Sequence, residues 1–177
     1  NSNIKIKWSV KRKRTDRETI KYSSFRKYIE CFVDDYFYEE SDHWKIGIAH
    51  SKDSFEQVSY VNSVYTRQGG SHVDHILSQI VNQARTFINK KYKTDVRPGQ
   101  LKNHFFLFVS CDIVNSQFDA QTKEKLITEP KDFGSSHDID KRTINKILKS
   151  EILQSILDWI DKKAAADERS KLRNLNK

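Results

Sequence analysis

The sequence predicts an α+β fold: a mixed sheet of about four strands with helices on one face, and a long C-terminal helix. Short segments with alternating apolar and polar residues, typical of half-buried strands, flank one long segment whose apolar residues recur at helical spacing. The pairs Gly69-Gly70 and Pro98-Gly99 separate these segments. We therefore divide the chain into an α+β domain over residues 1–143 and a C-terminal helical extension over residues 144–177.

The N-terminal part is predicted to contain a strand, a basic turn and a helix. Residues Asn3 to Val10 alternate between apolar and polar, which indicates a strand with one covered face. The basic run from Lys11 to Arg14 favours a solvated turn over a localisation signal or a nucleic-acid contact. From Ser24 to Tyr38 the apolar residues recur at steps of three and one, which predicts a helix with Ser24 as its N-cap.

Two strands and a tight turn come next. The segment His43 to His50 alternates regularly, and Phe55 to Tyr65 forms a second apolar segment with strand character. Both should lie in the same sheet. The second strand leads into Gly69-Gly70, where two glycines allow a sharp turn between a strand and a helix.

The helix after the glycine pair has the clearest pattern in the chain. Ser71 and Asp74 have the spacing of a capping box at its start, although the usual partner is Glu or Gln. The helix should end in the basic run Lys90 to Lys93, because cations suit the negative end of the helix dipole. Eight apolar residues form one stripe that should dock on the sheet: Val73, Ile76, Leu77, Ile80, Val81, Ala84, Phe87 and Ile88.

A returning strand and a long loop follow. The run Phe105 to Val114 is typical of a buried strand, so the strand–helix–strand order predicts a crossover connection. The loop Asn115 to Gly134 is long, and long loops in compact domains are often functional. Helical segments are predicted from Asp140 onward, with a kink near Ser150. The polar run Asp167 to Lys177 predicts a projecting helix or a frayed tail.

Composition limits the class of protein. A chain of 177 residues with 36% hydrophobic and 32% charged residues can form one domain with a densely ionic surface. Its net charge of +8 favours a polyanionic partner without identifying it. Cys31 and Cys111 lie in apolar sequence and are expected to be reduced core residues. No stretch approaches the roughly 18 apolar residues of a membrane span, so no membrane partner is expected. The chain contains no methionine, which predicts that it is a piece of a longer protein.

The residues alone form no complete active site. Neither a Gly-rich phosphate loop nor a serine or cysteine nucleophile motif is present. His72, Asp74 and His75 could ligate a metal, but the sequence supplies no further convergent ligand, so structural roles are favoured and no metal site is predicted. Asp138 and Asp140 precede a predicted helix and are interpreted as capping carboxylates.

Lys123 is the charged residue of greatest interest in the loop that follows the buried strand. On chemistry alone it is either an ordinary solvated lysine or an ammonium group presented to a phosphate. Surface lysines are the rule, so the composition favours the first interpretation.

Five motifs follow one another along the chain: Tyr60–Val64, Gly69–Asp74, Gln100–His104, Asn115–Glu124 and Pro130–Gly134. In this order they resemble the transducer domain of eukaryotic-type DNA topoisomerase II (type IIA), the ATP-driven enzyme that passes one DNA duplex through another. Weaker likeness extends from about Phe25 to Trp159, so the resemblance covers most of the chain.

The resemblance implies a role for the loop. In this family the nucleotide is held by an ATPase domain that precedes the transducer, and a transducer loop reaches into its pocket. Gln121, Thr122 and Lys123 match the nucleotide-contacting residues of that loop, and Lys123 matches the lysine that contacts the terminal phosphate. The resemblance therefore implies a catalytic role for Lys123, with ATP and Mg²⁺ as cofactors of the full-length enzyme and none bound by this segment alone.

A second match implies contact with DNA. Asn89, Lys90 and Lys91 fall where eukaryotic members carry a DNA-contacting lysine triplet, so one charge of the triplet is missing here. Lys93 could replace it. Phosphate contacts of this kind bind without sequence preference and weaken with salt. The same lysines could instead serve the helix dipole and solubility, and both interpretations stay open.

The resemblance also implies the partners of the parent protein. These are double-stranded DNA, a preceding ATPase domain and a following DNA-cleavage core of the same chain, and a second copy in a homodimer. It implies a nuclear location, with the site of viral DNA replication in a host cell as the alternative. The rival hypothesis is a stand-alone basic nucleic-acid-binding α+β module without catalysis, of the kind found in ribosomal proteins. Fold class alone does not separate the two hypotheses.

Overall fold

The structure is a computed structural model that describes residues 4–6 and 20–175. The chain divides into two compact units, Asn1–Asp34 and Asp35–Lys177. The predicted strand Asn3 to Val10 is described only at β1 (Ile4–Ile6), and the basic run Lys11 to Arg14 lies outside the described residues. The domain division after residue 143 stays a prediction.

The first unit contains a strand pair and a short helix. β1 pairs antiparallel with β2 (Ile20–Tyr22). α1 (Phe25–Ile29) begins after Ser24, whose side chain accepts a hydrogen bond from the backbone N–H of Lys27. The predicted N-cap is therefore confirmed.

The helix predicted over Ser24 to Tyr38 is wrong beyond α1. Phe37–Glu40 form the strand β3 instead, and every residue of β3 pairs with β4 (Trp44–His50). A continuous backbone ladder outweighs a weak helical pattern in the side chains. The prediction that Cys31 lies in the core is also wrong, because Cys31 is exposed; Cys111 is buried, and both are free thiols.

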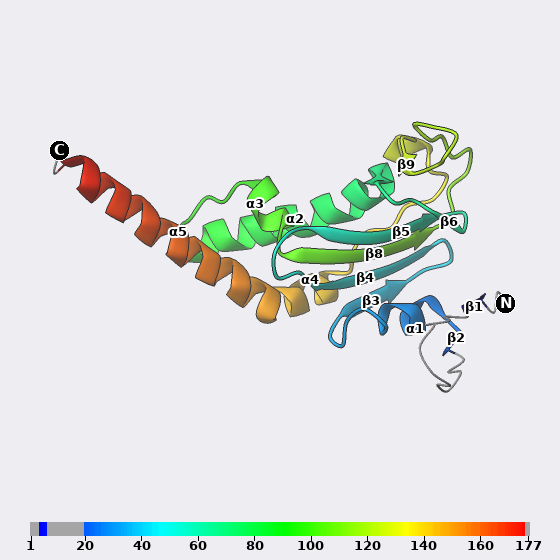
Figure 1. The fold of residues 1–177 in the computed structure, drawn as a ribbon, viewed down its shortest axis with the longest axis horizontal. Helices are drawn as coiled ribbons and strands as arrows, with labels where there is room; N and C mark the ends of the chain where they lie inside the picture. Colours follow the sequence, from blue (N-terminus) through cyan, green and yellow to red (C-terminus); the bar gives the residue numbers. More distant parts are fainter. Residues whose placement is uncertain (1–3, 7–19, 176–177) are drawn as a thin grey trace, which may run out of the picture. The chain divides into compact units, whose positions relative to one another are not determined.

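The second unit is built on a five-stranded sheet in the order β3-β4-β8-β5-β6 (Figure 1). β8 (Phe105–Cys111) lies at the centre, antiparallel to β4 and parallel to β5 (Glu56–Val61). The parallel pair confirms the predicted crossover connection between these two strands.

The single strand predicted over Phe55 to Tyr65 is wrong, because β5 and β6 (Val64–Tyr65) form a hairpin. Asn62 and Ser63 connect the two strands with positive φ angles of 50° and 66°. Two consecutive left-handed residues are what a tight two-residue hairpin turn requires.

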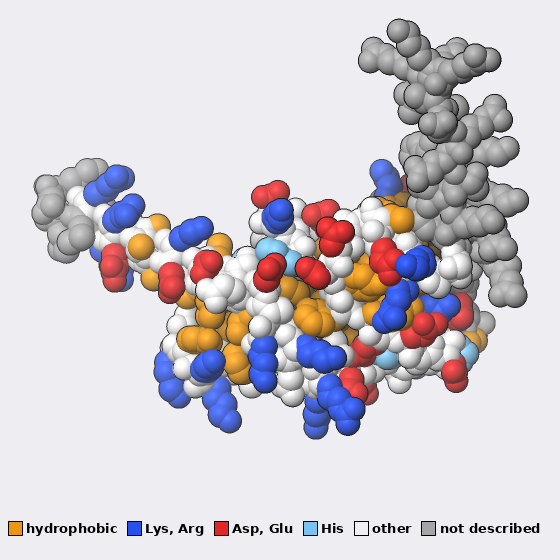
Figure 2. All heavy atoms as spheres, turned by 90° about the horizontal axis from the view of Figure 1, so that it is seen from below, with side chains coloured by type: hydrophobic (Ala, Val, Ile, Leu, Met, Phe, Trp, Pro, Cys, Tyr) orange, Lys and Arg blue, Asp and Glu red, His pale blue; other side chains and the backbone are white. Residues whose placement is uncertain are grey.

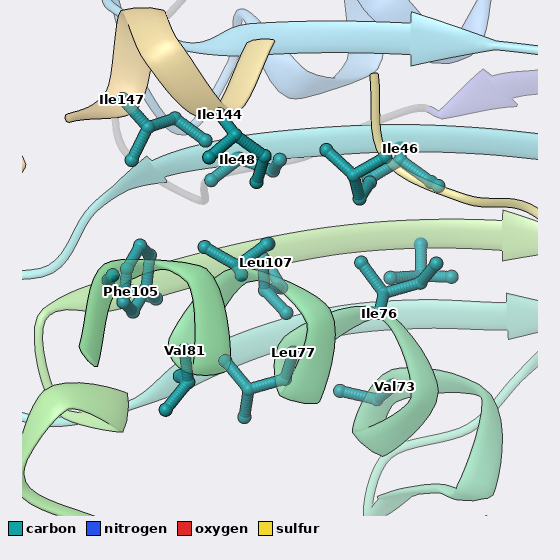
Figure 3. Close-up of a cluster of buried hydrophobic side chains, with 14 of the residues drawn as sticks. Ile46, Ile48, Val73, Ile76, Leu77, Val81, Phe105, Leu107, Ile144 and Ile147 are labelled. Carbon is teal, nitrogen blue, oxygen red and sulfur yellow. The ribbon is translucent and has the colours of Figure 1, made fainter. Parts of the chain in front are cut away.

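α2 (Ser71–Tyr92) supplies the main helical layer on the sheet. Seven of its eight predicted stripe residues are buried and Phe87 is half-buried. Figure 3 shows Ile76 of α2 toward Ile46 of β4 and Ile144 of α4 (Lys141–Ile147) beside Ile48, and Val73, Leu77 and Val81 belong to the same buried cluster. The predicted docking of the stripe is therefore confirmed.

The capping box predicted at the start of α2 is wrong. The N-cap is Gly70, which forms no side-chain capping bond, and the Ser71 hydroxyl instead lies 3.5 Å from the Leu126 carbonyl oxygen. A distant loop therefore takes the hydroxyl that the local pattern assigned to the helix start.

The remaining elements include a short helix before β8 and a second, two-stranded sheet. α3 (Pro98–Lys102) precedes β8, and the long loop after β8 contains the strand β9 (Lys125–Leu126) and the 3-10 helix η1 (Pro130–Asp132). β9 pairs parallel with β7 (Gly69–Gly70).

Two separate helices end the chain. α4 begins after Asp140, whose carboxylate accepts a hydrogen bond from Arg142 N at 2.6 Å, as capping predicts. The predicted kink near Ser150 is a full break, and α5 (Glu151–Leu175) starts after it. Residues 161–171 of α5 are all exposed, which favours the projecting helix over the frayed tail. Among the described residues, no helix is both long and apolar enough to cross a bilayer.

Candidate functional site

The loop that carries Lys123 is anchored to the start of α2. β9, directly after the loop tip, pairs with the glycine pair of β7, so Gly69 lies opposite Lys125 and Gly70 lies opposite Leu126. A Cβ atom on Gly70 would lie 2.6 Å from Leu126 N and closer still to Leu126 O. Only glycine allows this approach, and Gly70 also has a φ of 129°. The glycine pair therefore serves the docking of the loop as well as the turn into α2.

The tip of the loop presents three polar side chains. Gln121, Thr122 and Lys123 are all exposed. Lys123 has a φ of 55°, and its N–H donates to the Ala120 carbonyl at 3.0 Å, which closes a tight turn. Its Nζ lies 5.9 Å from the centre of the Phe118 ring. The structure thus brings the three predicted nucleotide-contacting residues together on one exposed turn.

Glu124, the residue after the lysine, is held by the turn that precedes α2. Its carboxylate accepts hydrogen bonds from Gln68 at 2.7 Å and Arg67 at 3.1 Å, and its carbonyl accepts one from Gln68 N at 2.9 Å. The bonds from Arg67 and Gln68 hold the pKa of the Glu124 carboxyl below its ordinary value. Sequence reasoning did not select Arg67 or Gln68, and the adjoining glycine pair is the only signal that could have pointed to this turn.

A row of buried, hydrogen-bonded polar side chains adjoins the same turn. Ser59 and Thr66 hydroxyls lie 2.6 Å apart, and Thr66 Oγ1 lies 3.2 Å from His72 Nε2. All three residues are buried. Burial lowers the pKa of His72 to about 4, so its ring is neutral at pH 7.

The structure gives the predicted metal candidates separate surroundings. His72 belongs to the row of buried polar side chains, His75 contacts the rings of Trp44 and Phe133, and Asp74 is exposed. Within residues 4–6 and 20–175, no group of three or more His, Cys, Asp or Glu side chains is placed to hold a metal ion.

The predicted DNA-contacting residues lie at the other end of α2. Asn89, Lys90, Lys91 and Lys93 are all exposed. Lys93 ends the helix in a left-handed conformation, and its N–H donates to the Asn89 carbonyl at 3.0 Å. Lys91 Nζ lies 5.2 Å from the ring centre of Tyr92, a distance at which a cation–π contact forms.

Lys90 belongs to a basic surface that extends beyond α2. It lines a hollow between α2 and α4 together with Lys141, and no acidic residue lines that hollow. Figure 2 shows that most side chains projecting from the lower edge of the viewed face are basic. The 22 residues of α2 separate this end of the helix from the Lys123 loop, which corresponds to roughly 33 Å of helix. Two distinct surfaces therefore lie at opposite ends of one helix.

Comparison with known proteins assigns this architecture to a family. The sequence model of the family described as DNA gyrase B matches residues 7–175. DNA topoisomerase 2 of Plasmodium falciparum is 42% identical over 139 residues, which cover 77% of this chain and 10% of that protein. DNA topoisomerase 2 of Candida glabrata is 46% identical over 124 residues, which cover 70% of this chain and 9% of that protein. The chain thus spans about a tenth of the length of these curated relatives.

Solved structures show the same fold. The ATPase region of Saccharomyces cerevisiae topoisomerase II superimposes with a TM-score of 0.75 at 36% identity, over 81% of this chain and 38% of that one. The ATPase and transducer domains of DNA topoisomerase II from Balamuthia mandrillaris superimpose with a TM-score of 0.79 at 32% identity, over 84% of this chain and 39% of that one. The predicted fold class is therefore confirmed.

Proposed function

The chain belongs to the DNA gyrase B family of type IIA topoisomerases, and we propose that it is the transducer segment of an ATP-dependent enzyme that passes one DNA duplex through another. The observation that carries the proposal is the exposed Lys123 turn, anchored through β9 to the start of α2. A lysine on a firmly held turn can reach a phosphate that a neighbouring domain holds.

Lys123 would act on the terminal phosphate of ATP. An ammonium group stabilises the charge that develops during phosphoryl transfer, and no covalent chemistry is required of it. Gln121 and Thr122 stand on the same turn and can add hydrogen bonds to the phosphate oxygens. ATP itself would be held by the preceding domain. Mg²⁺ would be held there too.

The same lysine would make domain closure depend on the nucleotide. A charge-assisted hydrogen bond contributes roughly 1.5–3 kcal/mol. A ligand shifts an equilibrium between two domain orientations only by its preference for one of them, so this contact biases closure about 10–150-fold. The change in domain orientation would be transmitted through α5 to a DNA-cleavage core that follows in the same chain. We call this transmission the relay. The parent enzyme would act as a homodimer on double-stranded DNA in the nucleus.

Strand passage by the full-length protein tests the proposal. We expect it to decatenate linked DNA circles when ATP and Mg²⁺ are present and to stop when ATP is replaced by ADP. A full-length protein that binds DNA but neither hydrolyses ATP nor decatenates would contradict the proposal. It would favour the non-catalytic basic module instead.

Replacing Lys90 and Lys91 together with alanine tests the DNA surface. We expect weaker DNA stimulation of ATP hydrolysis, because two phosphate contacts are lost. The slope of log affinity against log salt should fall by about 1.8, since each neutralised phosphate contributes about 0.9. Fluorescence anisotropy with a duplex at several salt concentrations measures this slope.

The matched control replaces Lys162 and Lys163, an exposed lysine pair on α5, and should leave the slope unchanged. An unchanged slope in the Lys90 and Lys91 variant would assign these lysines to the helix dipole and to the stacking of Lys91 on Tyr92.

A further inference from the structure

Asn62 forms several hydrogen bonds with the chain just after the end of the central strand β8. We call this set of bonds the Asn62 grip. Its Nδ2 donates to the Ile113 carbonyl at 2.9 Å, and its Oδ1 accepts from Ile113 N at 2.8 Å. Nδ2 also lies 3.3 Å from Ser116 Oγ, and the Asn62 N–H donates to the Cys111 carbonyl at 2.9 Å. Asn62 thus bonds to three positions between the end of β8 and the start of the Lys123 loop: Cys111, Ile113 and Ser116.

The geometry of this grip imitates a neighbouring strand. β8 ends at Cys111, and β5 ends at Val61, so the regular ladder between them stops there. The Asn62 amide then supplies a donor and an acceptor to the next backbone unit, as a strand would. Asn62 can do so because it has a φ of 50°, a left-handed conformation that asparagine tolerates better than most residues. The grip therefore extends the order of the sheet into the loop.

The part of the loop directly after the Lys123 turn is held by the same stretch of chain. Gln68 and Arg67 bind Glu124, and Gly70 pairs with Leu126. The two sides of the Lys123 turn also bond to each other: Ile127 N donates to the Gln117 carbonyl at 2.9 Å, and Asp119 N donates to the Lys125 carbonyl at 3.1 Å. Residues 62–70 therefore contact the chain before the Lys123 turn, at Ile113 and Ser116, and directly after it, at Glu124 to Leu126.

We propose that Asn62 is a positioning residue for Lys123, a proposal that rests on the phosphate-contacting role of that lysine. Lysine has a long flexible side chain, so the placement of its ammonium depends on a fixed backbone. Catalytic contacts lose much of their effect when a group is displaced by about 1 Å. Loss of the bonds from the Asn62 amide leaves residues 113–116 with fewer anchors, although Val114 N still donates to the Phe133 carbonyl, so the Lys123 turn is held less tightly relative to the sheet.

The variant that isolates this role is Asn62→Gly in the full-length protein. Glycine keeps the left-handed turn without strain and removes only the amide, so the hairpin can form. Ser63→Gly is the matched control: it changes the neighbouring residue of the same turn, whose φ is 66°, and leaves the Asn62 amide in place.

The readout compares a non-hydrolysable ATP analogue with ADP, each in the presence of Mg²⁺. Only the analogue carries the phosphate that Lys123 would contact. We expect Asn62→Gly to weaken binding of the analogue about tenfold, part of the range for a charge-assisted contact, and to leave ADP binding unchanged. A general loss of folding would weaken both nucleotides alike. Ser63→Gly should bind both as the unmodified protein does.

Lys123→Ala, measured beside these variants, separates the two proposals. If Lys123→Ala loses discrimination between the analogue and ADP while Asn62→Gly keeps it, the positioning role is wrong and the phosphate contact stands. If neither variant loses discrimination, the phosphate contact itself is wrong. Equal losses from Asn62→Gly and Ser63→Gly would also overturn the positioning role, because the turn rather than the amide would then be responsible.

Discussion

Replacing Lys123 with alanine in the full-length protein is expected to lower ATP hydrolysis about 10- to 150-fold and to leave DNA affinity nearly unchanged. The lost contact is worth roughly 1.5–3 kcal/mol, and about 1.4 kcal/mol corresponds to a factor of ten in rate. Lys123 is exposed, and alanine meets the same backbone cost as lysine at a φ of 55°, so folding should not change. Steady-state hydrolysis and duplex binding measure the two effects.

Lys125→Ala is the matched control for Lys123→Ala. Lys125 is an exposed lysine two positions further along, and its pairing with Gly69 uses the backbone only. Its replacement should leave hydrolysis unchanged. If the Lys123→Ala protein hydrolyses ATP at the rate of the Lys125→Ala protein, Lys123 does not contact the phosphate. Domain closure would then not depend on this lysine, and the proposed relay would be wrong.

Replacing Gly70 with alanine should destabilise the chain by roughly 3–5 kcal/mol, the upper part of the range for single substitutions. The new Cβ would lie 2.6 Å from Leu126 N, and the atoms it meets are backbone atoms of Leu126, which cannot rotate away as a side chain could. Either β7 and β9 separate or the start of α2 shifts. Urea unfolding of the 177-residue chain, followed by circular dichroism, measures the loss.

Gly99→Ala provides the comparison for Gly70→Ala. Gly99 lies in α3, and a Cβ there meets no atom within 4 Å. Alanine is the better helix former, so this variant should be as stable as the unmodified chain or more stable by up to about 1 kcal/mol. Equal stability of the two alanine variants would show that the loop does not dock tightly on the glycine pair.

The fold was predictable where one face of an element is buried. The stripe on α2 and the alternation of β4 follow from side-chain periodicity, because a covered face must be apolar whatever covers it. The prediction failed for β3 and for the β5–β6 hairpin. The outcome at β3 depends on backbone pairing with β4, and the outcome at the hairpin depends on the left-handed residues Asn62 and Ser63. Neither feature produces a periodic pattern in the sequence.

The candidate site was predictable only as far as its residue types. Gln121, Thr122 and Lys123 were found through their resemblance to a family, whereas nothing local pointed to Arg67, Gln68 or the amide of Asn62. The reason is the separation along the chain: Asn62 binds Ile113 across 51 residues, and Gln68 binds Glu124 across 56. Such contacts form only after the sheet has brought the two stretches together.

By itself, the sequence determined which faces are apolar, where α2 begins and ends, and that its two ends carry different charged groups. Those features follow from the local order of residues, because helical and strand periodicity are properties of a few consecutive turns or pairs. Only the tertiary structure decided that residues 62–70 hold the chain on both sides of the Lys123 turn. That arrangement depends on hydrogen bonds between residues far apart in the sequence, from the side chains of Asn62 and Gln68 and from the backbone pairing of β7 with β9. Local periodicity does not reveal such bonds, because it reports only on neighbouring residues.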